Sequence, residues 1–75
     1  MGNVIFTQHA LQKLQERRIS KQMVLNTVRF PEKLVTAGEK IYVFRKFDKK
    51  YLKVIFVRER ENIIIITQHF VNAFL

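Results

Sequence analysis

The spacing of apolar residues divides the chain into a helical first part and a strand-forming second part. A short apolar run at residues 3–6 (NVIF) predicts a strand. Residues 8–18 and 21–29 then place apolar side chains three and four positions apart, which predicts two amphipathic helices. The apolar stripes of these helices consist of Ala10, Leu11, Leu14, Met23, Val24, Thr27 and Val28.

Capping residues predict where both helices begin and where the second one ends. Thr7 and Ser20 directly precede the helical segments, and each hydroxyl is expected to accept a hydrogen bond from a backbone N–H of the first turn. Pro31 disfavours helical geometry at Phe30, so the second helix is expected to end there.

From residue 33 onward, β-branched and aromatic residues dominate the sequence. The segments KLVTA, KIYVFRK, YLKVIFV and NIIIITQ are separated by turns at residues 38–39, at 48–49 and in the run RERE. Connections this short join antiparallel neighbours. We therefore predict a single α+β domain over residues 1–75, with a short N-terminal strand, two helices, and a three- to four-stranded antiparallel meander that carries the helices on one face. The apolar tail FVNAFL extends the last strand, forms a final helix or binds a partner.

The turn positions also predict the strand register. With residues 48–49 at the first tip, Arg45 lies opposite Leu52. If residues 59 and 62 close the next hairpin, Leu52 lies opposite His69, so Arg45 and His69 share one face. The face expected to receive the helices carries Leu34, Thr36, Ile41, Val43, Leu52, Val54, Phe56, Ile63 and Ile65. The second face carries Lys33, Lys40, Tyr42, Phe44, Lys46, Tyr51, Lys53, Ile55, Val57, Ile64, Ile66 and Gln68.

Charge narrows the choice of partners. The 75 residues include 14 lysines and arginines against six acidic residues, a net charge of +8. Such a charge attracts nucleic acid, an anionic membrane surface or an acidic protein. The start MGNVIF is unlike a signal peptide and the longest apolar run, IIII, is too short to span a bilayer, so we expect a cytoplasmic protein without a membrane partner. The chain lacks cysteine, which excludes disulfides and thiolate metal sites.

The second face combines cations with aromatic rings. Lys46 and Lys53 attract phosphate groups, and Tyr42, Phe44 and Tyr51 offer flat surfaces on which the bases of single-stranded RNA stack. Aromatic residues are also good strand formers, so their presence alone does not require RNA. The alternative is that this face is covered by the tail, by a partner protein or by a second copy of the chain.

Acid–base chemistry is limited to a few residues. Cleavage of RNA by its 2′-hydroxyl needs a proton acceptor, a proton donor and positive charge, for which we select His9, His69, Arg17 and Arg45. If strand 3–6 lies beside the last strand, His9 approaches the end of the sheet that carries His69. Alternatively, His69 is a strand-end residue in solvent and His9 a first-turn residue that bonds to the backbone. The sequence shows no metal-ligand spacing and no glycine-rich phosphate loop, so we expect no metal and no cofactor.

A short motif occurs twice. FTQHA (6–10) and ITQHF (66–70) each end in one of the only two histidines. A helix cap and a strand end need no common site to share Thr-Gln-His, so coincidence is the simpler interpretation. The alternative is that His9 and His69 meet.

The stretch HALQKLQERRISKQMVLNTVRFPEKL resembles the opening of a family of small domains of unknown function, and the resemblance extends over residues 6–68. The matching positions are His9, Ala10, Arg17, Arg18, Ile19, Ser20, Val24, Pro31, Gly38, Tyr42, Val54 and Thr67. That family is similar in turn to BrnT-like and RelE-like toxins, which are small basic α+β proteins that cleave RNA without metal and are neutralised by an antitoxin. Of the candidate catalytic residues, His9 and Arg17 match the family pattern. The apolar tail departs from the basic C-terminus of those toxins.

The resemblance and the charge lead to one main expectation, a toxin-like, metal-independent endoribonuclease or an RNA-binding relative of a toxin–antitoxin system. Its partners would be RNA, either free or on the ribosome, and an antitoxin protein. The alternative is a non-enzymatic interaction module or homodimer that uses the second sheet face and the tail.

Overall fold

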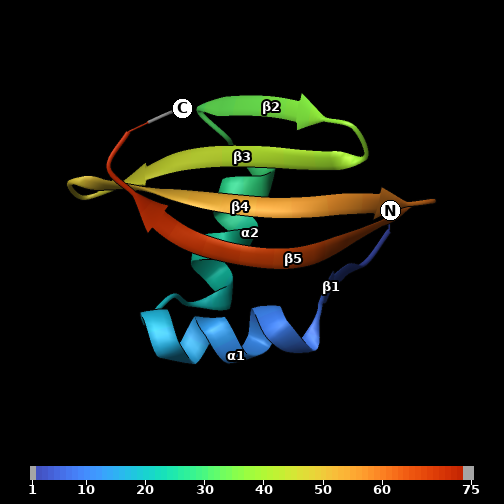
Figure 1. Cartoon of the computed structure of the whole chain (residues 1–75), viewed down its shortest axis with the longest axis horizontal. Helices are drawn as coiled ribbons and strands as arrows, with labels where there is room; N and C mark the ends of the chain where they lie inside the picture. Colours follow the sequence, from blue (N-terminus) through green and yellow to red (C-terminus); the bar gives the residue numbers. More distant parts are fainter. Residues whose placement is uncertain (1, 74–75) are drawn as a thin grey trace.

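Two helices and a five-stranded mixed sheet make up the α+β fold of the computed structural model, which describes residues 2–73. The order of the strands across the sheet is β1-β5-β4-β3-β2 (Figure 1). The elements are β1 (Val4–Phe6), α1 (Gln8–Arg17), α2 (Lys21–Arg29), β2 (Lys33–Ala37), β3 (Lys40–Phe47), β4 (Lys50–Glu59) and β5 (Asn62–Val71).

Both helices begin at the residues expected to cap them. The Thr7 hydroxyl accepts a hydrogen bond from the backbone N–H of Ala10 at 3.0 Å, and the Ser20 hydroxyl accepts one from Met23 at 3.1 Å. Helix α1 ends one residue earlier than predicted because Arg18 adopts a left-handed conformation with φ 55°, which closes the helix. Helix α2 ends before Phe30, as predicted.

Strands β2, β3 and β4 each pair antiparallel with the next strand along the chain, through turns of two residues. In all three turns the first residue has a positive φ: Gly38 (63°), Asp48 (60°) and Arg60 (61°). The predicted pairing of Arg45 with Leu52 and the predicted closure of the last hairpin at residues 59 and 62 are confirmed.

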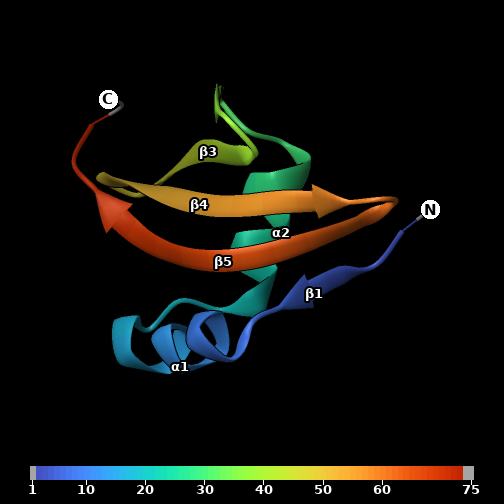
Figure 2. The same ribbon diagram turned by 45° about the vertical axis from the view of Figure 1, so that its right-hand side comes forward.

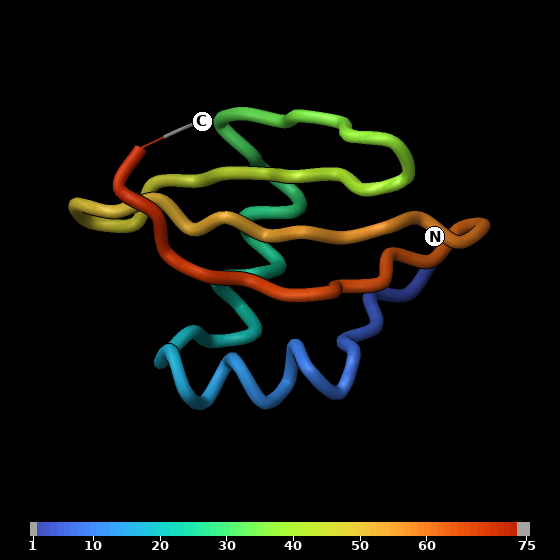
Figure 3. The backbone as a smooth tube through the Cα atoms, viewed as in Figure 1, coloured from blue at the N-terminus to red at the C-terminus, as the bar shows by residue number. Residues whose placement is uncertain are grey.

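The sheet has five strands. Three or four were expected in its antiparallel part, and β1 joins the edge of that part as a further strand. Val4 pairs in parallel with Ile63, and Phe6 with Ile65, so the N-terminal strand does lie beside the last strand. The pairing stops at Phe6, where the chain turns into α1, and α1 then runs alongside the remainder of β5 (Figure 3).

Helix α2 packs across one side of the sheet, as the apolar pattern predicts, whereas α1 lies along β5 (Figures 1 and 2), and both helices contribute residues to the core. The buried core consists of Ala10, Leu14, Ile19, Val24, Val43, Leu52, Val54, Phe56 and Ile65. Helix α2 packs on β3 and β4, so β2 lies at the edge beyond it. Two expected core positions on β2 are exposed for this reason, Leu34 (52% exposed) and Thr36.

A β-bulge in β5 changes the face on which the end of this strand projects. Phe56 pairs with Ile65 and Ile55 with Thr67, so Ile66 is an additional residue in β5. The predicted pairing of Leu52 with His69 is therefore wrong by one residue, and Leu52 pairs with Phe70 instead. Since side chains alternate along a strand, Phe70 turns toward the helices and His69 toward the opposite face.

Thr7 explains why the bulge occurs at this point of β5. Its backbone N–H donates to the Ile65 carbonyl at 3.1 Å, and its hydroxyl donates to the Ile66 carbonyl at 3.2 Å. Strand β1 ends at Phe6, so β5, which stays paired with β4, loses its partner on the other edge here and bonds to the cap of α1 instead. The extra residue accommodates this change of partner. Strand β5 continues to Val71, so the predicted tail begins as a strand extension, and residues 74–75 lie outside the described residues.

Candidate nucleic-acid interface

The face of the sheet away from α2, called the outer face below, carries a row of polar and aromatic residues across four strands. Lys33 on β2 pairs with Phe44 on β3, Phe44 with Lys53 on β4, and Lys53 with His69 on β5. Cross-strand partners share a face, so these four side chains lie in one line. The bulge is what brings His69 into this row.

Lys53 lies at the centre of an aromatic cluster. Its ammonium nitrogen is 4.9 Å from the centre of the Tyr42 ring and 5.8 Å from that of Phe44, both within range of a cation–π interaction. Phe44 is only 2% exposed, so in this structure it supports Lys53 and offers no surface to a base. Tyr42 is partly exposed, and a base would stack on it beside the ammonium group.

His69 is partly buried next to two positive charges. Burial lowers the pKa of His69, and the positive charges of Arg17 and Lys53 lower it further. A histidine with a pKa below its usual value is mostly neutral at pH 7, and a neutral imidazole accepts a proton. The environment of His69 therefore suits a general base.

Arg17 reaches β5 from the last turn of α1. Its Nη1 donates a hydrogen bond of 2.8 Å to the backbone carbonyl of Gln68, the residue before His69. This bond holds the guanidinium group beside the row of the outer face. Of the predicted catalytic residues, the structure thus brings His69 and Arg17 together, and it adds Lys53 from the predicted RNA-binding residues.

Arg45 lies apart from this group. It projects on the same face as Leu52, on the helix side of the sheet, where its Nη1 donates to the Phe30 carbonyl at 2.8 Å. This bond supports the C-terminal end of α2. The prediction that Arg45 and His69 share a face is therefore wrong, and the bulge at Ile66 is the physical reason.

The two Thr-Gln-His motifs lie side by side, which the interpretation as coincidence did not anticipate. Thr7 of the first motif bonds to the carbonyl of Ile66, and Gln68 of the second donates from Nε2 to the Ala10 carbonyl at 2.9 Å. Gln68 is fully buried, on the helix side instead of its predicted place on the second face, and its Oε1 has no hydrogen-bond partner among the described residues. His9 is exposed on α1 and is not among the groups that shift the pKa of His69. The motifs join α1 to β5 through their Thr and Gln residues.

The remaining predicted RNA-binding residues lie one row further toward the β3–β4 hairpin. Lys46 pairs with Tyr51, and Tyr51 with Val71, on the outer face. The Lys46 side chain is exposed, while its backbone N–H donates to the Glu32 carboxylate at 2.7 Å. Tyr51 is partly buried.

Basic residues gather at one end of the molecule. The C-terminal end of α1, the β3–β4 hairpin and the end of β5 lie together at the left of Figures 1 and 2. These segments and the adjoining start of α2 carry Lys13, Arg17, Arg18, Lys21, Lys46, Lys49, Lys50 and Lys53, against the acidic Glu16 and Asp48 and the carboxylate of Glu32, which accepts from Lys46. The two turns at the opposite end are balanced, with Lys40, Arg58 and Arg60 against Glu39, Glu59 and Glu61.

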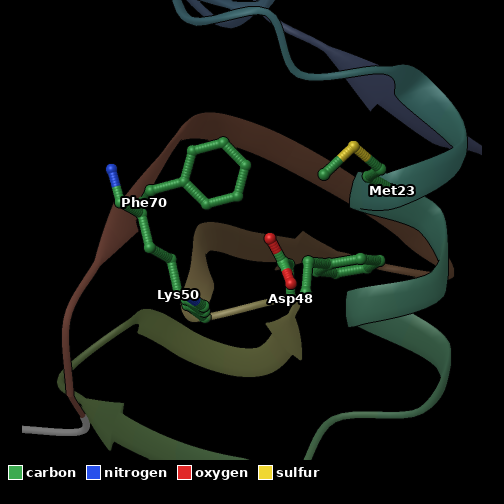
Figure 4. A pocket seen from close by; sticks show the side chains of 6 residues that line it. Met23, Asp48, Lys50 and Phe70 are labelled. Atoms are coloured by element: carbon green, nitrogen blue, oxygen red, sulfur yellow. The ribbon is translucent and has the colours of Figure 1, made fainter.

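The basic end also contains a pocket that the sequence did not reveal. It has a volume of about 430 Å³ and lies between α2, the β3–β4 hairpin and the end of β5, on the helix side of the sheet (Figure 4). Met23, Phe47, Asp48, Lys49, Lys50 and Phe70 line it. Phe70 reaches this pocket only because the bulge turns it toward the helices, so no local pattern could have predicted it.

Residues 2–73 contain neither a metal-binding cluster nor a helix suited to cross a membrane. No three histidine, cysteine, aspartate or glutamate side chains gather there as a metal-binding group. Neither α1 nor α2, the helices of this part of the chain, combines the length and the hydropathy needed to cross a bilayer.

Comparison with known families assigns the chain to one of them. A family model described as a domain of unknown function, DUF4258, matches residues 6–67, so the chain belongs to the DUF4258 family. This confirms the resemblance to a small domain of unknown function, whose description names no activity. The matched segment ends two residues before His69. No curated protein and no solved structure matches the chain.

Proposed function

We propose that this member of the DUF4258 family binds single-stranded RNA at the basic end of its outer face and cleaves it there without a metal ion. The observation that carries the proposal is the position of His69 next to Lys53 in one row, with Arg17 held beside it. The sequence pattern led to the same expectation, through its resemblance to a family that is similar in turn to BrnT-like and RelE-like toxins, which combine a small basic α+β fold with this reaction.

The chemistry follows from the charges around His69. The neutral imidazole takes the proton of an RNA 2′-hydroxyl, and the resulting oxygen nucleophile attacks the adjacent phosphorus. The P–O5′ bond breaks, the 5′-oxygen takes a proton from water, and the products are a 2′,3′-cyclic phosphate and a 5′-hydroxyl. Arg17 and Lys53 stabilise the additional negative charge that the phosphate group carries in the transition state.

Binding is assigned to the lysines and tyrosines of the same face. Lys46 and Lys53 attract the phosphates, and Tyr42 and Tyr51 contact the bases. Since RNA displaces counterions from these cations, its affinity is expected to fall as salt rises.

The test is incubation of the purified protein with end-labelled RNA in the presence of EDTA. His69→Ala is expected to lower the cleavage rate by about 100-fold or more, which is typical for loss of a general base. The matched control is His9→Ala, which removes the other histidine from an exposed position on α1 and is expected to leave the rate unchanged. Equal loss in both variants, or no loss in either, would contradict the assignment of His69.

A second function is favoured by a different observation. Beyond the basic end, the outer face carries aliphatic residues that are only partly buried, namely Ile55, Val57 and Ile64. Such a surface suits a partner protein, for which an antitoxin or a second copy of the chain are the candidates. Val57→Lys is expected to dissociate a homodimer in size-exclusion chromatography, while a monomeric wild-type chain would exclude the homodimer.

A further inference from the structure

The pocket at the basic end combines an apolar lining with charged groups at its rim. Met23 comes from α2, Phe47 from the end of β3 and Phe70 from the end of β5, and all three also pack against the core. In Figure 4 the side chains of Met23, Asp48 and Phe70 point into the same space. Phe47 and Phe70 supply aromatic rings and Met23 supplies a flexible thioether, a combination that suits a planar, uncharged ring system.

Asp48 restricts which ring system fits. A carboxylate only accepts hydrogen bonds, through two oxygens side by side. Among the four RNA bases, guanine alone presents two adjacent N–H donors, N1–H and N2–H, on its Watson–Crick edge. Adenine and cytosine present one donor beside a ring nitrogen lone pair, and uracil presents one donor between two carbonyl oxygens, so each would oppose a lone pair to the carboxylate.

The hairpin gives Asp48 a defined position. Asp48 is the first residue of a two-residue turn, with φ 60°, a conformation that aspartate and asparagine tolerate better than most residues. The following Lys49 and Lys50 bring two positive charges to the rim of the same pocket. A base in the pocket therefore has phosphate-binding groups in this turn and at the first residue of β4.

We propose that this pocket is a guanine-binding subsite, in which Phe47, Phe70 and Met23 contact the base, Asp48 accepts from N1–H and N2–H, and Lys49 and Lys50 bind the attached phosphate. The inference rests on the proposed function in taking RNA as the natural ligand. His69 and Phe70 are consecutive on β5, so an RNA strand that passes round the end of β5 contacts both sites.

The experiment uses mononucleotides, which need no cleavage. The full-length protein carries only two methionines, so the ¹³C-labelled methyl group of Met23 is a resolved NMR probe of the pocket. Titration with 3′-GMP is expected to shift this signal at a concentration about tenfold lower than the one needed with 3′-AMP. A preference of this size is typical of a side chain that makes two hydrogen bonds to one base. Equal affinities for both nucleotides, or no shift with either, would overturn the proposal.

Asp48→Asn is the decisive variant. Asparagine keeps the shape and tolerates the positive φ, but it replaces one acceptor by a donor. The expected result is loss of the tenfold preference for 3′-GMP over 3′-AMP. The ratio is the readout, because removal of a negative charge raises phosphate affinity equally for both nucleotides. Glu39→Gln, in the turn at the opposite end, is the matched control and should keep the preference. An unchanged ratio in Asp48→Asn would overturn the role of the carboxylate.

The outcome is separable from that of the cleavage assay. A guanine preference in wild type and in His69→Ala, without RNA cleavage, supports the subsite and contradicts the nuclease. Cleavage that depends on His69, with no nucleotide-induced shift of Met23, supports the nuclease and overturns the subsite.

Discussion

His69 lies beside two cations that make its protonation unfavourable, and this has a measurable consequence for the pH dependence of cleavage. The proposed base works only when neutral, so activity should fall as the pH drops through the pKa of His69 in the folded protein. Because burial, Arg17 and Lys53 lower that pKa, activity should persist below the ordinary histidine value of about 6.5.

Lys53→Met tests the electrostatic part of this explanation. Removal of one cation should raise the pKa of His69, so the acid limb of the pH–rate profile moves to higher pH, in addition to any loss of rate. NMR titration of the His69 ring proton measures the same shift without activity. Lys49→Met, which removes a cation that does not contribute to the pKa shift of His69, is the control. A pKa of His69 that stays the same in Lys53→Met would contradict the contribution of Lys53.

At the scale of secondary-structure elements, Thr7 connects the start of α1 with the bulge in β5. Thr7→Ala removes both the cap bond to Ala10 and the bond to the Ile66 carbonyl. Ser20→Ala removes a cap bond of the same type, which joins Ser20 to the first turn of α2. We expect about 1 kcal/mol of lost stability for Ser20→Ala and about 2 kcal/mol for Thr7→Ala, measured by urea denaturation. Equal losses would mean that the Ile66 bond contributes no net stability.

The elements themselves could be predicted because their signals are local. Thr7, Ser20 and Pro31 mark helix ends through their immediate neighbours, and two-residue turns specify the register of β3 with β4. The bulge could not be predicted, because it depends on hydrogen bonds between Thr7 and residues almost sixty positions away. Every error about the end of β5, including the false proximity of Arg45 and His69 and the missed role of Phe70, follows from that one non-local contact.

At the scale of the whole molecule, the uneven charge distribution predicts how RNA approaches. Lys49 and Lys50 lie at the basic end, whereas Arg58 and Arg60 lie in or next to a balanced turn at the other end. Replacing both residues of either pair by glutamine lowers the net charge by the same amount. Only the Lys49/Lys50 double variant should weaken RNA binding. It should also make the decrease of log affinity with log salt less steep, by about 0.7 for each phosphate that the protein no longer neutralises. Equal effects of the two double variants would indicate binding by net charge without orientation.

The bulge also determines how the gene tolerates changes of length. Ile66 is partly buried and has no cross-strand partner in β4, so exchange for another aliphatic residue should be mild. In-frame loss of its codon removes the bulge itself: Phe56–Ile65 and Ile55–Thr67 then follow one another in a regular ladder that leaves each side chain on its present face, and what is lost is the Ile66 carbonyl that accepts from Thr7. A deletion scan along β5 should therefore show its mildest effect at position 66, because loss of any paired residue shifts the register and moves the side chains that follow to the other face.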